Sequence, residues 1–328
     1  MSNARAVWIR EPGEVDVLEV RDATVRAPGH GEVEVAVAAA GLNRADLLQR
    51  RGLYGPPAGI PAEIPGLEFA GEVARVGAGV AAFAPGDRVM GIVGGGAMCT
   101  RVVVHERELL RVPEGMSLTD AAAIPEAFVT AYDALVLQGA MASGDRVLVH
   151  AAGSGVGTAA LQIARAVGAS ALGTVRGEAK QKRLQDMGFD AVVVGHDGFA
   201  DAVRARTGGR GADLCLDAVG ASYLAETLRA MAPRGRVVLI GTLGGSAGEI
   251  PLATLLRQRI TLLGTVLRAR PLEEKATLAQ RFAHAMLPRF ASGDLRPVVD
   301  AVLPMAEVAA AHARMERNDS FGKIVLAW

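Results

Sequence analysis

A glycine-rich turn, placed between a buried-strand pattern and a helix pattern, constrains this sequence more than any other feature. Residues 146–165 read RVLVHAAGSGVGTAALQIAR. Residues 147–149 are apolar, as in a parallel strand covered on both faces, and apolar residues return at helical spacing from Thr158. The small residues between them let the backbone turn sharply and leave N–H groups free at a helix start. We predict that this turn binds the pyrophosphate of a dinucleotide.

The match of this turn to the pattern GxGxxG is imperfect, because Ala152 and Ser154 replace the first two glycines in one register. The prediction therefore depends on the strand before the turn and the helix after it. The residues assigned to the turn are Gly153, Ser154, Gly155, Val156 and Gly157.

Composition narrows the class of protein. A chain of 328 residues is long enough for about two domains. The 35 basic and 35 acidic side chains cancel, which argues against general binding to nucleic acid or to an anionic membrane. The sequence shows no signal-peptide pattern and no membrane-spanning run, and it has only two cysteines, Cys99 and Cys215. We expect a soluble protein in the reducing cytoplasm.

The first part of the chain, residues 1–121, has short β patterns separated by Pro-Gly turns, which predicts an all-β, barrel-like domain. One segment, 43–50, instead has the pattern of a single short helix. Residues 122–265 alternate between strand and helix patterns, which is typical of a doubly wound parallel sheet. The helices expected there begin with one at 127–137, and the last strand is expected at 260–266. Residues 266–328 then add a helix at 272–291, a strand at 299–303, a helix at 305–315 and a strand at 322–327.

Several motifs together resemble one known family. They are GLNRADLLQRRGLYGPP, IPGLEFAGEV, GDRVMGI, PEGMSLTDAAAIPEAFVTAYDAL, HAAGSGVGTAALQIA and the final GKIVL. These stretches resemble the zinc-free NADPH:quinone oxidoreductases of the medium-chain dehydrogenase/reductases, most closely the p53-inducible type. The resemblance implies an α/β protein with a GroES-like β-barrel catalytic domain, residues 1–121 and 266–328. It also implies a Rossmann doubly wound parallel sheet, residues 122–265, inserted between the two parts.

The residue types at two positions argue against a metal. Zinc-dependent members of the superfamily have a cysteine and a histidine where this chain has Asn43 and Leu67, which supply neither a thiolate nor an imidazole. The four-cysteine segment that holds a structural zinc is also missing, since Cys99 stands alone. We expect a metal-free site, without zinc-assisted alcohol oxidation.

The cofactor is predicted from the end of the second Rossmann strand. A cationic pair, Arg176 and Lys180, follows that strand, and cations suit the 2′-phosphate of NADPH better than the ribose hydroxyl of NADH. Glu178 between them leaves a solvated, mixed-charge helix start as the alternative. Relatives often have a tyrosine after the third strand, where this chain has Gly195 and His196.

The resemblance implies the remaining cofactor contacts. The segments expected to line the nicotinamide end, and a lysine expected near the phosphate end, are Thr130, Gly241, Thr242, Leu243, Gly244, Leu267, Arg268 and Lys323. If they have no role in cofactor binding, Thr130 is an ordinary helix residue and Lys323 is an exposed residue at the end of a strand. His150 and Cys215 are expected to be core residues on buried strands.

Two polar residues are the candidates for contact with substrate. Tyr54 is protonated at neutral pH and can hydrogen-bond a carbonyl, and Asn43 can donate from its amide. The alternatives are turn packing for Tyr54 and helix capping for Asn43. Glu68 resembles the family's glutamate beside the vacant metal site, although a buried structural role is the simpler interpretation.

The resemblance implies NADPH-dependent hydride transfer to a quinone, with the cofactor supplying the chemistry and the site supplying orientation. One alternative is reduction of an enone or enoyl thioester, with Tyr54 as proton donor. Another is a nucleotide-dependent binding or structural protein of the crystallin-like kind. The resemblance further implies a homodimer formed through the edge strand at 260–266.

Overall fold

The computed structural model describes residues 1–195 and 198–328, and the chain divides into two compact units. The first unit combines both ends of the chain, Met1–Val129 and Leu267–Trp328. The second unit is the uninterrupted segment Thr130–Val266. Nowhere in the described part of the chain is a helix both long and apolar enough to cross a membrane.

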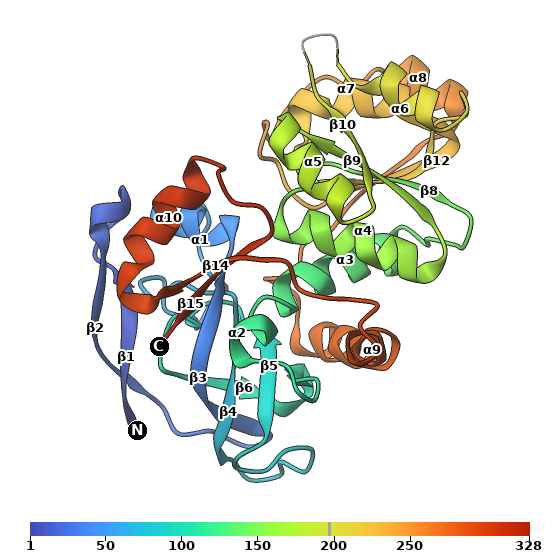
Figure 1. Ribbon diagram of the computed structural model, residues 1–328. Coiled ribbons are helices and arrows are strands. Elements are labelled where there is room, and N and C mark those ends of the chain that lie inside the picture. The colour runs from blue at the N-terminus through green and yellow to red at the C-terminus, as the bar shows by residue number, and fades with distance from the viewer. Residues whose placement is uncertain (196–197) are drawn as a thin grey trace. The chain divides into compact units, whose positions relative to one another are not determined.

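The first unit is built around β3 (Glu32–Leu42), the longest strand of its seven-stranded sheet. The last strand of the chain, β15 (Lys323–Ala327), pairs with β3 antiparallel, and the red β15 lies beside the blue β3 in Figure 1. The expected β domain made from both chain ends is thereby confirmed. The remaining strands of this unit are β1 (Ser2–Ile9), β2 (Leu18–Val25), β4 (Glu68–Val76), β5 (Arg88–Ile92), β6 (Arg101–His105), β7 (Leu109–Arg111) and β14 (Val299–Pro304).

The core of this unit follows from the side-chain alternation of β3. Val33, Val35 and Val37 pack in a cluster with side chains of β4 and β5, whereas Ala40 and Leu42 belong to a second cluster with β1 and β15. Because successive side chains of a strand point to opposite faces, one strand can contribute to two cores. The strand that ends at Leu42, directly before Asn43, is therefore fixed on both sides.

The first unit also contains helices. The predicted helix at 43–50 is confirmed as α1 (Arg44–Arg50), and the predicted helix at 272–291 as α9 (Leu272–Ala291). A second short helix, α2 (Leu118–Ala121), was not predicted. The sequence did contain a signal for this helix, because Ser117 is a preferred N-cap residue. In the structure its hydroxyl accepts from the Asp120 N–H at 3.0 Å, as an N-cap does. The last helix begins as the 3₁₀ turn η5 (Met305–Glu307) and continues as α10 (Val308–Glu316), and two further 3₁₀ turns are η1 (Val15–Val17) and η2 (Glu106–Glu108).

The second unit contains a six-stranded, all-parallel sheet with the strand order β10-β9-β8-β11-β12-β13. The order reverses between β8 and β11, which is the switch point of a doubly wound fold, and the predicted Rossmann sheet is confirmed. Its strands are β8 (Arg146–Val149), β9 (Ser170–Val175), β10 (Asp190–Val193), β11 (Ala212–Asp217), β12 (Met231–Leu239) and β13 (Thr261–Gly264). Its helices α4 (Gly155–Val167), α5 (Glu178–Asp186), α6 (Ala200–Arg206), α7 (Ala221–Ala230) and α8 (Leu252–Gln258) connect them.

The segment predicted as one helix at 127–137 is helical with a different hydrogen-bond pattern. It consists of the π-helical turn η3 (Pro125–Val129), the short α3 (Thr130–Tyr132) and a second π-helical turn, η4 (Asp133–Gln138). An example of its wider pattern is the Gly139 N–H, which donates to the Ala134 carbonyl five residues earlier at 2.9 Å. Apolar periodicity does not reveal such turns, which often occur at functional sites.

The close approach of β3 and β4 depends on Gly71. A Cβ atom at Gly71 would lie 2.1 Å from the backbone oxygen of Ala36. We expect Gly71→Ala to lower the free energy of unfolding by about 1–3 kcal/mol, because the strands must move apart. Gly91 on β5 is the matched control, since its added Cβ would have its nearest neighbour at 3.4 Å. Urea unfolding of both variants tests this, and an equal loss in the two would contradict it.

Candidate functional site

The glycine turn lies at the carboxyl end of β8, beside the switch point of the sheet. Ser154 caps α4, and its hydroxyl accepts from the Gly157 N–H at 3.0 Å. A Cβ at Gly157 would lie 2.5 Å from the Ala151 carbonyl oxygen, so only glycine lets the helix approach the strand this closely. The turn therefore presents a helix N-terminus where open α/β sheets bind nucleotides.

The cationic pair predicted for the 2′-phosphate lies at the same edge of the sheet. Arg176 is exposed and directly follows β9, while Lys180 is in the first turn of α5. Sequence reasoning missed Tyr223 of α7. Burial raises the pKa of its phenol, and the charge of Arg176 offsets part of that rise. Gly195 is described, but His196, the other position compared with relatives, lies outside the described residues.

The loop 241–244 follows β12 and also lies at this edge. The Gly244 N–H donates to the Val219 carbonyl at 2.7 Å, and Asp217 accepts from the Val219 N–H at 2.7 Å, which fixes the loop against the end of β11. Thr242 and Leu243 are both exposed.

Three buried side-chain oxygens of this unit lack hydrogen-bond partners within the described chain. They are the Thr130 hydroxyl, Oδ2 of Asp217 and Oε1 of Gln258. Asp217 is the last residue of β11, at the carboxyl edge of the sheet. An unpaired buried polar atom is costly, which suits an edge that gains a ligand. The glycine turn and the Thr130 and Asp217 oxygens are groups of the kind that a dinucleotide can use.

His150 and Cys215, expected as core residues, are both fully buried in this unit. The His150 ring nitrogens are bonded to the Thr174 and Thr227 hydroxyls, both at 2.9 Å. Burial lowers the pKa of His150 to about 3, so it stays neutral. Both residues contribute to packing.

A buried ion pair forms the centre of a polar cluster in the first unit. Lys323 of β15 donates to Oε1 of Glu68 at 2.5 Å, to Oδ1 of Asn43 at 2.6 Å and to the Leu42 carbonyl at 2.9 Å. Its ammonium group has three donors, and all three are used. This arrangement argues against the phosphate contact expected for Lys323, because no N–H remains for a phosphate oxygen. Lys323 is instead a buried partner of Glu68.

Asn43 both caps α1 and belongs to this cluster. Its backbone N–H donates to Asp46 at 2.8 Å, and its amide donates to Glu68 Oε1 at 2.9 Å and to the Gly41 carbonyl at 3.2 Å. To donate to a substrate, as predicted, the Asn43 amide would have to give up its longer hydrogen bond, the one to the Gly41 carbonyl. Asp46 is fully buried, which raises its pKa to about 6. Leu67, beside Glu68, is buried and apolar.

Glu126 is a site residue that sequence reasoning missed. Its backbone N–H donates to Oε2 of Glu68 at 2.8 Å. Burial, followed by the neighbouring charge of Glu68, raises the pKa of Glu126 to about 8. The signal in the sequence was a single acid in the apolar run AAAIPEAFV.

Arg268 holds the loop that carries Tyr54. The buried guanidinium donates to the carbonyls of Gly94 at 2.8 Å and Tyr54 at 3.1 Å, and to the Gln49 side chain at 2.5 Å. It also lies 4.7 Å from the centre of the Tyr54 ring. Burial raises the pKa of the Tyr54 phenol, which therefore stays protonated. Leu267 and Arg268 were predicted to contact the cofactor, but Arg268 is engaged with side chains and carbonyls of its own unit, and Leu267 is buried.

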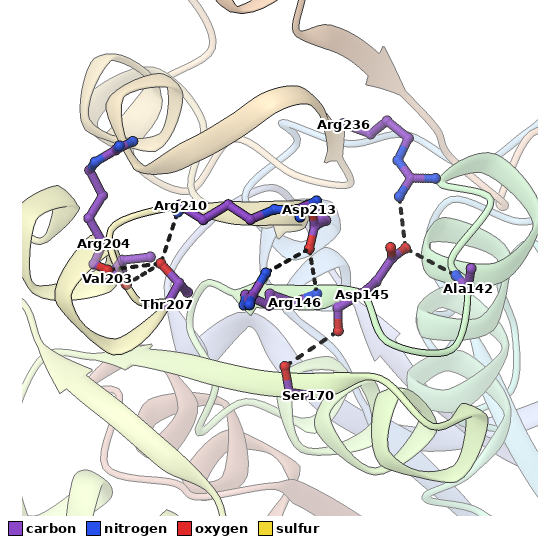
Figure 2. Close-up of polar contacts among 11 residues, drawn as sticks. Ala142, Asp145, Arg146, Ser170, Val203, Arg204, Thr207, Arg210, Asp213 and Arg236 are labelled. Carbon is purple, nitrogen blue, oxygen red and sulfur yellow. Dashed lines mark hydrogen bonds and ion pairs between the residues drawn. The ribbon is translucent and has the colours of Figure 1, made fainter.

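A cavity of about 160 Å³ lies at the opposite, amino edge of the parallel sheet, lined by the first residues of β8, β9, β10 and β11. Figure 2 shows Asp213 beside Arg146 and Arg210 there, and Asp145 beside Arg236. The Arg206 side chain lines this cavity and is paired with Asp190 at 2.9 Å. Ligands of such sheets bind at the carboxyl edge, so we assign these ion pairs a structural role.

We expect Lys323→Met to lower the free energy of unfolding by about 3–5 kcal/mol, because it leaves the buried Glu68 carboxylate without its cation. Lys182→Met is the matched control, since Lys182 and its partner Asp186 are exposed on α5 and their pair contributes little. Urea unfolding at pH 7 gives both values. Losses of similar size in the two variants would refute the importance of the buried pair.

Two family models match the chain. Residues 29–114 match the model described as alcohol dehydrogenase GroES-like domain, and residues 155–284 match the model described as zinc-binding dehydrogenase. The quinone oxidoreductase-like protein 2 homolog of Nematostella vectensis is 32% identical over 326 residues, which cover 98% of this chain and 88% of that protein. A mycocerosic acid synthase-like polyketide synthase of Mycobacterium tuberculosis is 40% identical over 235 residues. That match covers 71% of this chain but only 11% of the synthase.

Solved structures resemble the whole chain. An NAD-dependent alcohol dehydrogenase is 34% identical with a TM-score of 0.88, and 99% of each chain is covered. A quinone oxidoreductase of Pseudomonas syringae is 29% identical with a TM-score of 0.87, covering 99% of this chain and 100% of that one. The CurK enoyl reductase is 28% identical with a TM-score of 0.86, and 99% of each chain is covered.

Proposed function

The chain belongs to the medium-chain dehydrogenase/reductase superfamily, and from this membership we propose that it is an NADPH-dependent oxidoreductase that reduces quinone-like acceptors without a metal. The observation that carries the proposal is the Asn43, Glu68 and Lys323 cluster. At the positions where zinc-dependent relatives need a thiolate and an imidazole, this chain has an amide engaged in that cluster and the buried Leu67.

We propose that the carboxyl edge of the parallel sheet holds NADPH, which supplies the hydride. The backbone of 153–157 would bind the pyrophosphate, and Arg176 and Lys180 the 2′-phosphate. Thr130 and the loop 241–244 would bind the nicotinamide half. The exposed position of Arg176 at the end of β9 and the unpaired Thr130 hydroxyl support these assignments.

The substrate-side groups belong to the first unit. Tyr54 would donate a hydrogen bond to the acceptor carbonyl, held in place by Arg268 stacked against its ring. Asn43 would orient Glu68 and Lys323. A quinone needs little further assistance, since the charge that develops on reduction is delocalised over its ring and oxygens.

We expect NADPH oxidation with ortho- or para-quinones, and a strong preference for NADPH over NADH. Lys180→Ala should raise the KM for NADPH about 10- to 100-fold, because it removes a charge-assisted bond to the 2′-phosphate, and should leave the KM for NADH almost unchanged. Lys182→Ala on the same helix is the control and should change neither. Equal effects of Lys180→Ala on the two cofactors would rule out the 2′-phosphate assignment.

A second candidate function, reduction of an activated carbon–carbon double bond, is favoured by the similarity to enoyl reductases and to polyketide synthases. The same assay with enones and enoyl thioesters separates the two. If NADPH binds but no acceptor of either class is reduced, the crystallin-like alternative of a nucleotide-dependent binding protein gains support.

We also propose a homodimer formed through β13, the edge strand of the parallel sheet. Among the described strands, β13 pairs only with β12. Apolar side chains lie exposed on nearby segments, among them Leu252 at 62% and Leu256 at 75% on α8 and Val266 at 60%. Exposed apolar residues grouped beside an open strand edge are typical of a protein interface.

We expect Leu256→Glu to convert the dimer to monomer, because a charge would be buried in the apolar interface. Leu53→Glu, at an equally exposed leucine of the first unit, should leave the dimer intact. Sedimentation equilibrium measures both masses. A native protein that is already monomeric, or a Leu256→Glu variant with the mass of the native dimer, would contradict the interface.

A further inference from the structure

We propose that Glu126 is the catalytic acid that protonates the acceptor once the hydride has been transferred. The inference rests on the proposed reductase function and adds a proton donor to it.

The position of Glu126 is fixed by its backbone, while its side chain is left without a partner. The Glu126 N–H is bonded to Glu68 Oε2, and Glu68 is in turn held by Lys323. Glu126 is partly exposed, and among the described residues its carboxyl group has no hydrogen-bond or ion-pair partner. It also lies on the π-helical turn η3, an uncommon backbone form that is frequent at functional sites. A carboxyl group that is anchored but unbonded is available to a substrate.

The electrostatic environment keeps this carboxyl group protonated near neutral pH. Burial raises its pKa most, and the charge of Glu68 on β4 raises it further, with a smaller contribution from Asp46 of α1. Lys323 and Arg268 lower it, but the result is a pKa of about 8. On its remaining sides η3 packs on β5 and on α9, where Phe128 meets Phe290. An acid whose pKa lies near the working pH is the most effective proton donor.

Tyr54 is the neighbouring group that competes for this role. The Glu126 charge acts on the Tyr54 phenol, which places the two groups within electrostatic range of each other. Because burial raises the pKa of Tyr54 from 10, the phenol is a weaker acid than Glu126 at neutral pH. Tyr54 is therefore suited to hold the carbonyl, and Glu126 to supply the proton.

The proton of Glu126 would complete a two-electron reduction of the acceptor. A reduced nicotinamide gives two electrons and one hydrogen to the acceptor as hydride, which leaves an anion on the acceptor. The O–H bond of Glu126 then breaks, and its proton forms a new O–H bond on a hydroquinone anion or a new C–H bond at the α-carbon of an enolate. Glu126 becomes a carboxylate and takes a proton from water, so one acceptor, one reduced nicotinamide and one proton yield the reduced product.

The demand for this proton differs between acceptors. A hydroquinone anion is stable and takes a proton from water rapidly, whereas an enolate must be protonated at carbon, which is slow without a positioned acid. Glu126 should therefore contribute much more to the reduction of alkenes than to that of quinones.

The test compares Glu126→Gln, which retains the shape of the protonated acid, with Glu126→Asp, which retains the acid. In Glu126→Gln we expect kcat/KM for an enone to fall about 100-fold or more and that for a quinone to fall less than about tenfold. In the native enzyme, kcat/KM for the enone should decrease above pH 8, and Glu126→Gln should lack this decrease. Glu126→Asp should recover part of the enone activity. A purely structural role would lower both activities equally and leave the pH profile unchanged, and that result would overturn the proposal.

A measurement without cofactor or substrate provides an independent readout. The folded-state pKa of Glu126 lies above the value of about 4.3 for an unfolded chain, so the stability it contributes is full below that pH and is lost as the pH rises towards 8. Glu126→Gln cannot titrate, so its stability relative to the native protein should increase between pH 5 and pH 8 and then level off. A difference that does not change with pH would overturn the proposal. A native protein that is inactive on every acceptor would instead refute the proposed function.

Discussion

The ion pair between Lys323 and Glu68 is the interaction on which the first unit depends. It joins β15, at the end of the chain, to β4 near its beginning, and it is almost fully buried. A buried ion pair is stable only when its geometry is good and its remaining donors and acceptors are hydrogen-bonded. Here Lys323 uses all three of its N–H donors. Glu68 also accepts from the Asn43 amide and the Glu126 N–H. Strands β15 and β4, the Asn43 side chain and the backbone of Glu126 are therefore fixed by one pair.

The second unit obtains its order differently. Its parallel sheet has two edges of contrasting chemistry: arginine–aspartate pairs such as Arg210 and Asp213 at the amino edge, and the glycine turn with Arg176 at the carboxyl edge. The amino edge satisfies its own charges, whereas the carboxyl edge leaves the oxygens of Thr130 and Asp217 unpaired within the described chain. The carboxyl edge is the one at which we propose that the nucleotide binds.

The sequence was most informative where local geometry decides the structure. The helix at 43–50, the glycine turn and the alternation of strands and helices all follow from periodicity and turn chemistry, and all are found. The sequence was least informative where the structure depends on the pattern of backbone hydrogen bonds or on residues that are distant in the chain. The π-helical turns have the same apolar spacing as an α-helix, and α2 is short enough for its Ser117 cap to be overlooked. Glu126 is a single acid in an apolar run, and its role depends on Glu68, which is distant in the sequence.

The sequence by itself determined the fold class, the glycine turn between β8 and α4 and the residue types at Asn43 and Leu67, because each of these depends on neighbouring residues or on side-chain chemistry alone. Only the tertiary structure decided that Lys323 binds a carboxylate, that Arg268 holds the Tyr54 loop and that Glu126 is an acid near pH 8. The physical reason is that the state of an ionisable group depends on its burial and on its charged neighbours. For Lys323 the deciding neighbour, Glu68, is 255 residues away in the chain.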